Sequence, residues 1–275
     1  MSLAGTRGSA LLASRRVERR AFVLLAAAGV LGAAVGRGTA ELIEDPPSRA
    51  AGRLEPAAAR PTQPPGTLPP PVGEIDRLPG ETPRLALTID DGVSSEVVAA
   101  FTTVAADTGL RLTLFPNGCY RSWTDNARAL RPLVESGQVA LGNHTFSHPD
   151  LRTLDDAGVA DEITRNRQFL ADTFGAEATP FFRPPYGSHD ERVDRIAADC
   201  GHPTVAMWNG TLADDRLIDA DELMAAARQW FAAGSIVIGH ANHATVTTVF
   251  DELLALLADR ALETVTLADV WARPV

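Results

Sequence analysis

Two neighbouring carboxylates, Asp90 and Asp91, follow a short apolar segment and precede a glycine. The segment over residues 85–89 is typical of a buried strand, and a helical pattern begins soon after Gly92. Adjacent carboxylates repel each other unless a cation lies beside them, so this pair requires a metal ion or an arginine. A plain Asp-Asp-Gly turn is the simpler interpretation of this stretch alone, and any partners must come from elsewhere in the chain.

Two histidines, His144 and His148, lie four residues apart just after another expected strand. One turn of backbone can bring both imidazoles to a common point, although this spacing by itself more often has a structural meaning. An aspartate from a different strand end would complete a set of two histidines and one carboxylate. Such a set leaves coordination positions free for water and substrate.

Further polar residues follow three other strand ends. Arg183 and Tyr186 follow one of them in an Arg-Pro-Pro-Tyr run, His240 ends another, and Trp208 closes a third with Asp214 a few residues on. Each has an ordinary interpretation, such as a structural histidine or a surface arginine. Reactive residues at five strand ends are harder to explain in that way, because the carboxyl ends of parallel strands meet on one face.

Strands and helices alternate through the part of the chain that carries these residues. Apolar runs and turn residues predict seven strands, over residues 85–89, 111–115, 138–141, 180–183, 204–208, 235–239 and 263–267. Helical periodicity and capping residues predict helices over residues 95–108, 124–136, 156–174, 190–200, 221–233 and 246–260. This alternation favours a single α/β domain with a parallel sheet, either open or closed into a barrel.

The composition restricts the class of protein. The chain has 275 residues, of which 45% are hydrophobic, and its net charge of −10 argues against a nucleic-acid partner. All 25 basic residues are arginines. Chemistry that needs a lysine, such as a Schiff base or a phosphate-loop lysine, is therefore excluded.

Residues 1–40 resemble an export signal. The segment is basic, and a pair of arginines precedes a run of apolar or small residues over 21–35. This run is short for a membrane span and suits the core of a twin-arginine-type signal, with cleavage after Ala40. An uncleaved N-terminal anchor is the alternative. After cleavage we expect no stable membrane span.

Residues 41–82 are rich in proline, alanine and glycine, and we expect them to form an extended, disordered linker. The folded domain would then span residues 83–275. The two cysteines, Cys119 and Cys200, are compatible with a disulfide in an oxidising compartment, but their spacing does not show whether they meet.

Taken together, the motifs resemble those of the polysaccharide deacetylases with a NodB homology domain, carbohydrate esterase family 4. The likeness covers about residues 84–270, nearly the whole expected domain. The five family motifs correspond to Thr-Ile-Asp-Asp-Gly at 88–92, His-Thr-Phe-Ser-His at 144–148, Arg-Pro-Pro-Tyr at 183–186, Asp-Asp in place of Asp-Trp at 214–215, and Ile-Gly-His at 238–240.

The resemblance implies a distorted (β/α) barrel of about seven parallel strands. It also implies that Asp91, His144 and His148 hold a divalent metal, most often zinc in relatives, with cobalt, manganese and nickel as alternatives. The roles implied for the other motif residues are a general base (Asp90) with its partner (Arg183), a general acid (His240) oriented by Asp214, an oxyanion-binding backbone N–H (Tyr186), and the walls of an acetyl pocket (Trp208 and Ile238).

We therefore expect a secreted, monomeric, metal-dependent hydrolase that removes N-acetyl groups from a glycan, with peptidoglycan or a chitin-like polymer first. An O-acetyl xylan esterase, a metal-free amidase of the same fold and a non-catalytic wall-binding module are the alternatives. Asp215 stands where the family motif has tryptophan, which removes an aromatic wall and adds charge near the mouth of the site. This replacement bears on substrate choice more than on catalysis.

Overall fold

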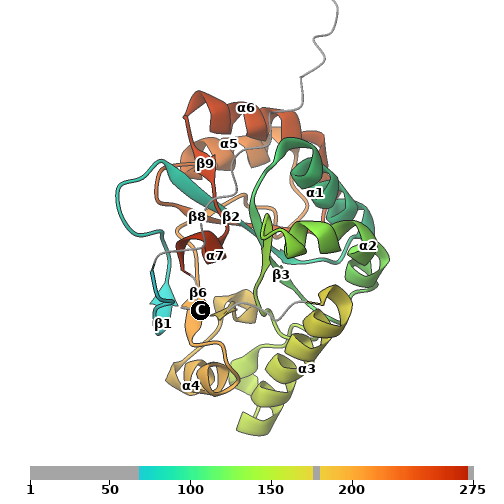
Figure 1. Cartoon of the computed structure of the whole chain (residues 1–275), viewed down its shortest axis with the longest axis vertical. Coiled ribbons are helices and arrows are strands. Elements are labelled where there is room, and N and C mark those ends of the chain that lie inside the picture. The colour runs from blue at the N-terminus through green and yellow to red at the C-terminus, as the bar shows by residue number, and fades with distance from the viewer. Residues whose placement is uncertain (1–67, 176–179, 272–275) are drawn as a thin grey trace, which may run out of the picture. The chain divides into compact units, whose positions relative to one another are not determined.

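The computed structural model describes residues 68–175 and 180–271, so the expected export signal and most of the expected linker lie outside the described residues. Strands alternate with helices along this part of the chain (Figure 1). The strands are β1 (Gly73–Ile75), β2 (Arg84–Asp91), β3 (Leu112–Pro116), β4 (Val139–Leu141), β5 (Phe181–Phe182), β6 (Thr204–Ala206), β7 (Gly210–Thr211), β8 (Ile236–His240) and β9 (Glu263–Thr264). The helices are α1 (Ser95–Thr108), α2 (Arg121–Glu135), α3 (Asp156–Phe174), α4 (Glu191–Asp199), α5 (Ala220–Trp230), α6 (Phe250–Asp259) and α7 (Leu267–Val270).

All the ladders between these strands are parallel, and they form two sheets. The larger sheet has the order β4-β3-β2-β8-β7, with β9 pairing on the first residues of β2, and the smaller has the order β1-β6-β5. Among the described residues, an isolated bridge between Asn143 and Phe182 joins the two sheets at the ends of β4 and β5, and an antiparallel bridge between Arg77 and Ser235 joins them beside β1 and β8. The α/β fold is thus confirmed. The closed ring of seven strands that the resemblance implied stays a prediction, because the described strands pair as two sheets.

The helices begin and end where capping residues stand in the sequence. Ser94 accepts a hydrogen bond from the backbone N–H of Val97 at the start of α1, and Asp155 caps α3 in the same way. Gly109 and Gly175 then end these helices in the left-handed conformation, which glycine adopts without steric cost. Both helices accordingly have the bounds predicted from the sequence.

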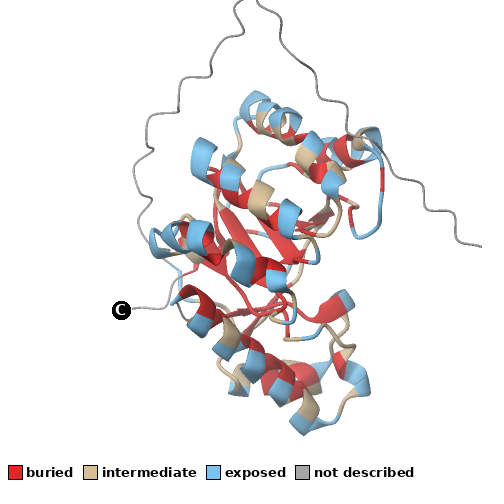
Figure 2. Ribbon diagram, turned by 90° about the vertical axis from the view of Figure 1, so that its right-hand side faces the viewer, coloured by how far each residue is buried: buried red, intermediate tan, exposed pale blue. Residues whose placement is uncertain are grey.

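Strand β2 runs through the core of the domain and ends at the acidic pair. It pairs with β3 on one side and β8 on the other, and every residue after Arg84 is buried. Figure 2 shows the strands buried in the interior and the exposed faces of the helices turned outward. Burial on both faces explains why the strand reads as a continuous apolar run and not as an alternating one.

Besides small shifts in the ends of other elements, four features differ from the sequence prediction. Residues 73–75, assigned to the linker, form β1 and pair with β6, so the domain begins before residue 83. Strand β7 was missed because it has only two residues. The last predicted strand is shorter, and Thr266 starts the short helix α7 with a reciprocal capping box. The predicted helix over 246–260 is divided into the 3₁₀ turn Ala244–Thr248 and α6.

Two further points concern membranes and disulfides. No helix among the described residues is long and apolar enough to cross a membrane. Cys119 and Cys200 both carry free thiols, so the disulfide that the composition permitted is not formed. Burial raises the pKa of both thiols, which keeps them protonated at neutral pH.

Candidate active site and metal centre

The acidic pair is buried at the carboxyl end of β2. Asp90 is opposite His240 in the parallel register with β8, while Asp91 is the last residue of the strand. Asp91 has a φ of 69°, a left-handed conformation that is uncommon for a residue with a side chain. Its carbonyl oxygen accepts hydrogen bonds from the indole Nε1 of Trp123 at 2.8 Å and the backbone N–H of Asn117 at 3.1 Å, and these bonds hold the strained turn in place.

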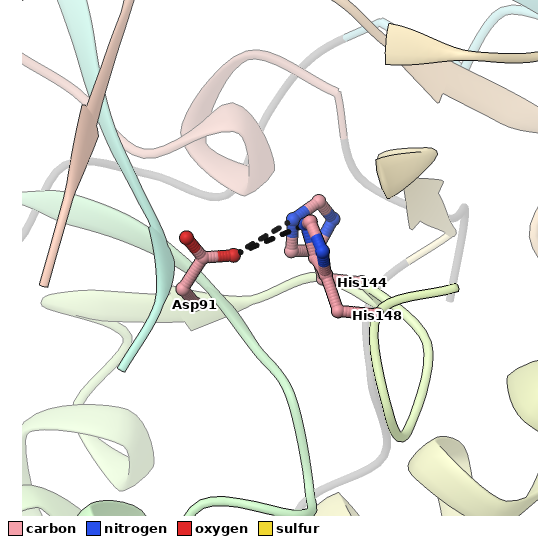
Figure 3. A group of neighbouring side chains, drawn as sticks. All are labelled: Asp91, His144 and His148. Atoms are coloured by element: carbon pink, nitrogen blue, oxygen red, sulfur yellow. Dashed lines mark ion pairs between the residues drawn. The ribbon is translucent and has the colours of Figure 1, made fainter. Parts of the chain in front are cut away.

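The histidine pair lies in the loop after β4, across from Asp91 (Figure 3). The Nε2 atoms of His144 and His148 each lie 3.3 Å from Asp91 Oδ1. The two rings meet edge to face with centroids 4.9 Å apart. One carboxylate oxygen and two imidazole nitrogens therefore converge, as the spacing of the histidines allowed.

A backbone contact fixes which nitrogen of His144 faces Asp91. Its Nδ1 lies 2.7 Å from the carbonyl oxygen of Arg183, so Nδ1 carries the proton that this oxygen accepts. In the neutral ring Nε2 then carries a lone pair on the side that faces Asp91. Orientation of a ligating histidine by a hydrogen bond to its other nitrogen is a common feature of metal sites.

The residues fit a divalent cation. Asp91, His144 and His148 are a group whose possible ligand atoms all lie within 4.8 Å of one another. Asp91 Oδ1 is buried and has no hydrogen-bond partner, a state that is costly for a carboxylate oxygen unless a positive charge lies nearby. Burial would raise the pKa of Asp91, but the adjacent imidazoles of His144 and His148 hold it well below its usual range. The carboxylate is thus ionised and available as a ligand.

The histidine loop rests on buried polar residues that the motif does not contain. Asn117 donates through Nδ2 to the carbonyl oxygens of His144 and Thr145, at 2.6 and 3.1 Å. Glu162 on α3 accepts from both the backbone N–H and the hydroxyl of Ser147, at 2.8 and 2.7 Å. These bonds hold the loop from two sides. Sequence reasoning missed them because Asn117 and Glu162 lie far from the loop in the chain.

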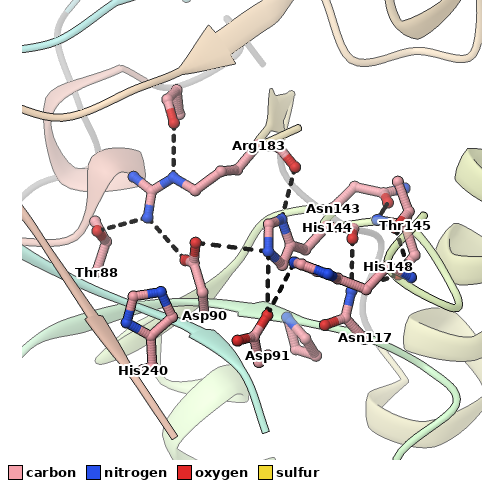
Figure 4. A network of polar contacts seen from close by, with 12 residues as sticks. Thr88, Asp90, Asp91, Asn117, Asn143, His144, Thr145, His148, Arg183 and His240 are labelled. Carbon is pink, nitrogen blue, oxygen red and sulfur yellow. Dashed lines mark hydrogen bonds and ion pairs between the residues drawn. The ribbon is translucent and has the colours of Figure 1, made fainter. Parts of the chain in front are cut away.

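Asp90 forms an ion pair with Arg183 in addition to its contact with His144. Arg183 Nη1 lies 2.8 Å from Asp90 Oδ1, and both side chains are almost fully buried (Figure 4). The guanidinium also donates to the hydroxyl of Thr88 and to the carbonyl oxygen of Ala206, and it stacks on the ring of Phe115 at 4.2 Å. Burial lowers the pKa of Arg183 but its charge is sustained by Asp90. The ion pair is the buried, hydrogen-bonded kind in which loss of one partner is costly.

His240 faces the pocket from β8 and is held by Asp214. Its Nδ1 lies 2.9 Å from Asp214 Oδ1, and its backbone N–H donates to Asp214 Oδ2 at 3.1 Å. Burial alone would lower the pKa of His240, but the hydrogen bond to Asp214 and the charge of Asp90 raise it to about 9. The ring is therefore an imidazolium at neutral pH, with Nε2 as a proton donor.

These groups line a pocket of about 500 Å³. Trp208 and Ile238 contribute apolar surface to it, and Asp215 lines it as well. Tyr186 is 71% exposed, and its ring lies edge to face on that of His148 with centroids 4.5 Å apart. Every residue predicted for the site from the sequence lines this pocket except Arg183 and Asp214, which lie behind Asp90 and His240.

Strained backbone concentrates at this pocket. Among the described residues only six other than glycine have positive φ, and four of them are Asp91, Thr145, His148 and Tyr186. A fifth, Ala213, precedes Asp214 directly. Such conformations persist only where surrounding contacts hold the backbone in place, and they are frequent at functional sites. Their clustering here agrees with a site whose side chains are oriented by the loops between strands and helices.

Comparison with known proteins identifies the family. The polysaccharide deacetylase family matches residues 77–205. An uncharacterized protein of Streptomyces coelicolor is 34% identical over 200 residues, which are 71% of this chain and 72% of that protein. The chain belongs to the polysaccharide deacetylase family. This is the family that the five motifs indicated, and the matched region includes the acidic pair, the histidine pair and Arg183.

Two further similarities bear on the fold and on the range of relatives. The peptidoglycan-N-acetylglucosamine deacetylase PgdA of Listeria monocytogenes is 27% identical over 188 residues, which are 68% of this chain but 39% of that protein. The match thus spans well under half of this relative. The chitin deacetylase of Colletotrichum lindemuthianum, a solved structure, is 23% identical and covers 74% of this chain and 94% of its own, with a TM-score of 0.65. At that identity the likeness shows the fold alone.

Proposed function

We propose that the protein is a metal-dependent deacetylase that hydrolyses N-acetyl groups of a glycan and is exported to act outside the cell or in the cell wall. The observation that carries this proposal is the unpartnered oxygen of Asp91 between two imidazole nitrogens, with a buried ion pair and an imidazolium beside it. Family membership supports the reaction class, and the basic, apolar N-terminal segment supports export.

Asp91, His144 and His148 would hold the cation, with zinc as the first candidate because its ligands are commonly nitrogen and carboxylate oxygen. A bound divalent cation would polarise the amide carbonyl and lower the pKa of a nearby water molecule. The three side chains would hold the cation at the carboxyl end of β2, beside Asp90, the residue that precedes Asp91 in the strand.

Asp90 has the position and partner of a general base. As water attacks the amide carbon, Asp90 takes one of the protons of that water, and the carbon becomes tetrahedral. Arg183 fixes the orientation of the carboxylate through the 2.8 Å contact to Oδ1. The other oxygen, Oδ2, lies 3.6 Å from His144 Nε2 and so faces the metal ligands.

His240 has the properties of the general acid. When the carbon–nitrogen bond breaks, the leaving amine needs a proton, and an imidazolium held by Asp214 can deliver it from Nε2. Acetate and a free amine are the products. The backbone N–H of Tyr186 is proposed to stabilise the oxyanion, with Trp208 and Ile238 forming the apolar wall for the acetyl methyl group.

Peptidoglycan or a chitin-like polymer is the preferred substrate class, because relatives named for both have the same family or fold. An O-acetyl xylan would be handled by the same groups, since the ester carbonyl needs the same base and cation. A metal-free amidase is disfavoured by the intact ligand set, and a non-catalytic module is disfavoured because base, acid and ligands are all present in one pocket.

Acetate release from N-acetylglucosamine oligomers tests the proposal. The purified domain is expected to release acetate, to lose this activity with a chelator, and to regain it with zinc. Activity that is insensitive to the chelator would favour the metal-free amidase. No acetate release from oligomers, peptidoglycan or acetylated xylan by the zinc-loaded protein would contradict the proposal and favour a binding module.

A further inference from the structure

Asn242, in the loop after β8, makes two hydrogen bonds that join it to the turn at the end of β2. Its Nδ2 donates to Asp91 Oδ2 at 2.6 Å, and its Oδ1 accepts from the backbone N–H of Val93 at 3.1 Å. Asn242 is outside the five motifs, and it does not line the pocket. It nevertheless contacts a side chain that is central to the proposed metal centre.

The two oxygens of Asp91 are in different surroundings. Oδ2 is occupied by the Asn242 amide, while Oδ1 has no hydrogen-bond partner and lies 3.3 Å from the Nε2 atoms of both His144 and His148. A carboxylate that is free to rotate can present either oxygen, or both, to a cation. A donor held on Oδ2 removes that freedom and leaves Oδ1 as the oxygen that faces the histidines.

We propose that Asn242 is a positioning residue of the metal centre, which holds Asp91 so that Oδ1 is presented to the cation together with the two imidazoles. The inference rests on the metal dependence proposed above. It assigns to Asn242 a role in metal affinity, because hydrogen-bond partners of metal ligands commonly change affinity 10–100-fold when they are removed.

Asn242 also connects the ligand strand with the strand of His240. The backbone N–H of Ala241 donates to the carbonyl oxygen of Asp90 at 3.0 Å, and that of Ser94 donates to the carbonyl oxygen of Ala241 at 3.0 Å. These backbone bonds already join the two loops without the Asn242 side chain. Loss of the side chain is therefore expected to affect the orientation of Asp91 more than the position of the loop.

The competing explanation is that Asn242 only fastens the turn through Val93. The test is the zinc affinity of Asn242→Ala, measured by competition with a chromogenic chelator, beside the melting temperature of the metal-free protein. Asn126→Ala is the matched control, because the Asn126 amide donates to the carbonyl oxygens of Ser95 and Ser122 and touches no metal ligand. It removes an asparagine that joins the start of α1 to α2.

We expect Asn242→Ala to bind zinc at least tenfold more weakly than the wild type, with a metal-free melting temperature close to that of the wild type, while Asn126→Ala keeps wild-type affinity. If the alanine variant cannot be purified, Asn242→Leu, which has a similar shape but no donor, is expected to show the same loss of affinity. Wild-type zinc affinity in either variant, or a loss matched by Asn126→Ala, overturns the inference. If the wild type itself binds no zinc, it is the proposed metal dependence that fails.

Discussion

Replacement of Asp214 by asparagine is expected to move the alkaline limit of activity to lower pH. His240 has a pKa of about 9, against an ordinary value for histidine of about 6.5, so the fold favours the imidazolium by on the order of 3 kcal/mol. The hydrogen bond from His240 Nδ1 to Asp214 Oδ1, 2.9 Å long, is the leading cause that raises this pKa, with Asp90 contributing as well. Asparagine keeps the shape and an acceptor but removes the negative charge.

Because Asp90 remains, the pKa is not expected to return fully to the ordinary value. We expect the alkaline pKa of kcat/KM to fall by about 1–2 pH units in Asp214→Asn, with a rate at pH 8 that is roughly fourfold lower if the fall is 1.5 units. The assay is acetate release from N-acetylglucosamine oligomers between pH 5 and 10.5. Asp215→Asn is the matched control, since Asp215 is the exposed neighbour that lines the pocket and is not bonded to His240.

If the alkaline limb of the pH profile of kcat/KM stays unchanged in Asp214→Asn, or moves equally in both variants, the assignment of His240 as an acid whose pKa is raised by Asp214 is refuted.

The pH dependence of stability gives a second measurement. Because the folded pKa of His240 is raised, its contribution to stability is complete below about pH 6.5 and is lost as the pH rises through about 9. Urea unfolding should therefore show a larger loss for Asp214→Asn at pH 6 than at pH 10.

Two further substitutions test the buried framework. Arg183→Met leaves the Asp90 carboxylate buried without its partner. We therefore expect the free energy of unfolding in urea to fall by about 3–5 kcal/mol and acetate release to be lost. Near-wild-type stability would show that the ion pair is dispensable. Gly92→Ala places a Cβ within 2.3 Å of the Trp123 ring at a φ of 98°, whereas Gly109→Ala, at a φ of 75°, places one where nothing lies within 4 Å. In urea unfolding we therefore expect Gly92→Ala to lose clearly more stability than the roughly 1–2 kcal/mol expected of Gly109→Ala. Equal losses would contradict the packing described at the end of β2.

The part of the candidate site that could be predicted from the sequence is the set of polar residues at the ends of buried strands. Asp90, Asp91 and His240 end buried strands whose apolar runs can be recognised in the sequence, and parallel strands bring their carboxyl ends together. The two histidines share one loop, so their spacing was informative without the fold. The pairing of Arg183 with Asp90 came from the family resemblance, and the structure supplies the contact.

The parts that could not be predicted depend on contacts between distant segments. Strand β1 comes from a proline-rich stretch and is a strand only because β6 offers it a parallel edge. Glu162 lies on α3, most of whose polar residues face solvent, and nothing local shows that it accepts two hydrogen bonds from Ser147. Asn242 is 151 residues from Asp91, and a lone asparagine after a strand carries no signal of its own.

The division of the acidic pair into a ligand and a base is the central claim, and a paired measurement of zinc binding and acetate release tests it most directly. Asp90→Asn is expected to bind one zinc ion per chain and to release acetate at least a hundredfold more slowly than the wild type, because the proton acceptor is lost while the three proposed ligands remain. Asp91→Asn is expected to lose zinc binding itself. Wild-type turnover by Asp90→Asn, or unchanged zinc affinity of Asp91→Asn, would contradict the account.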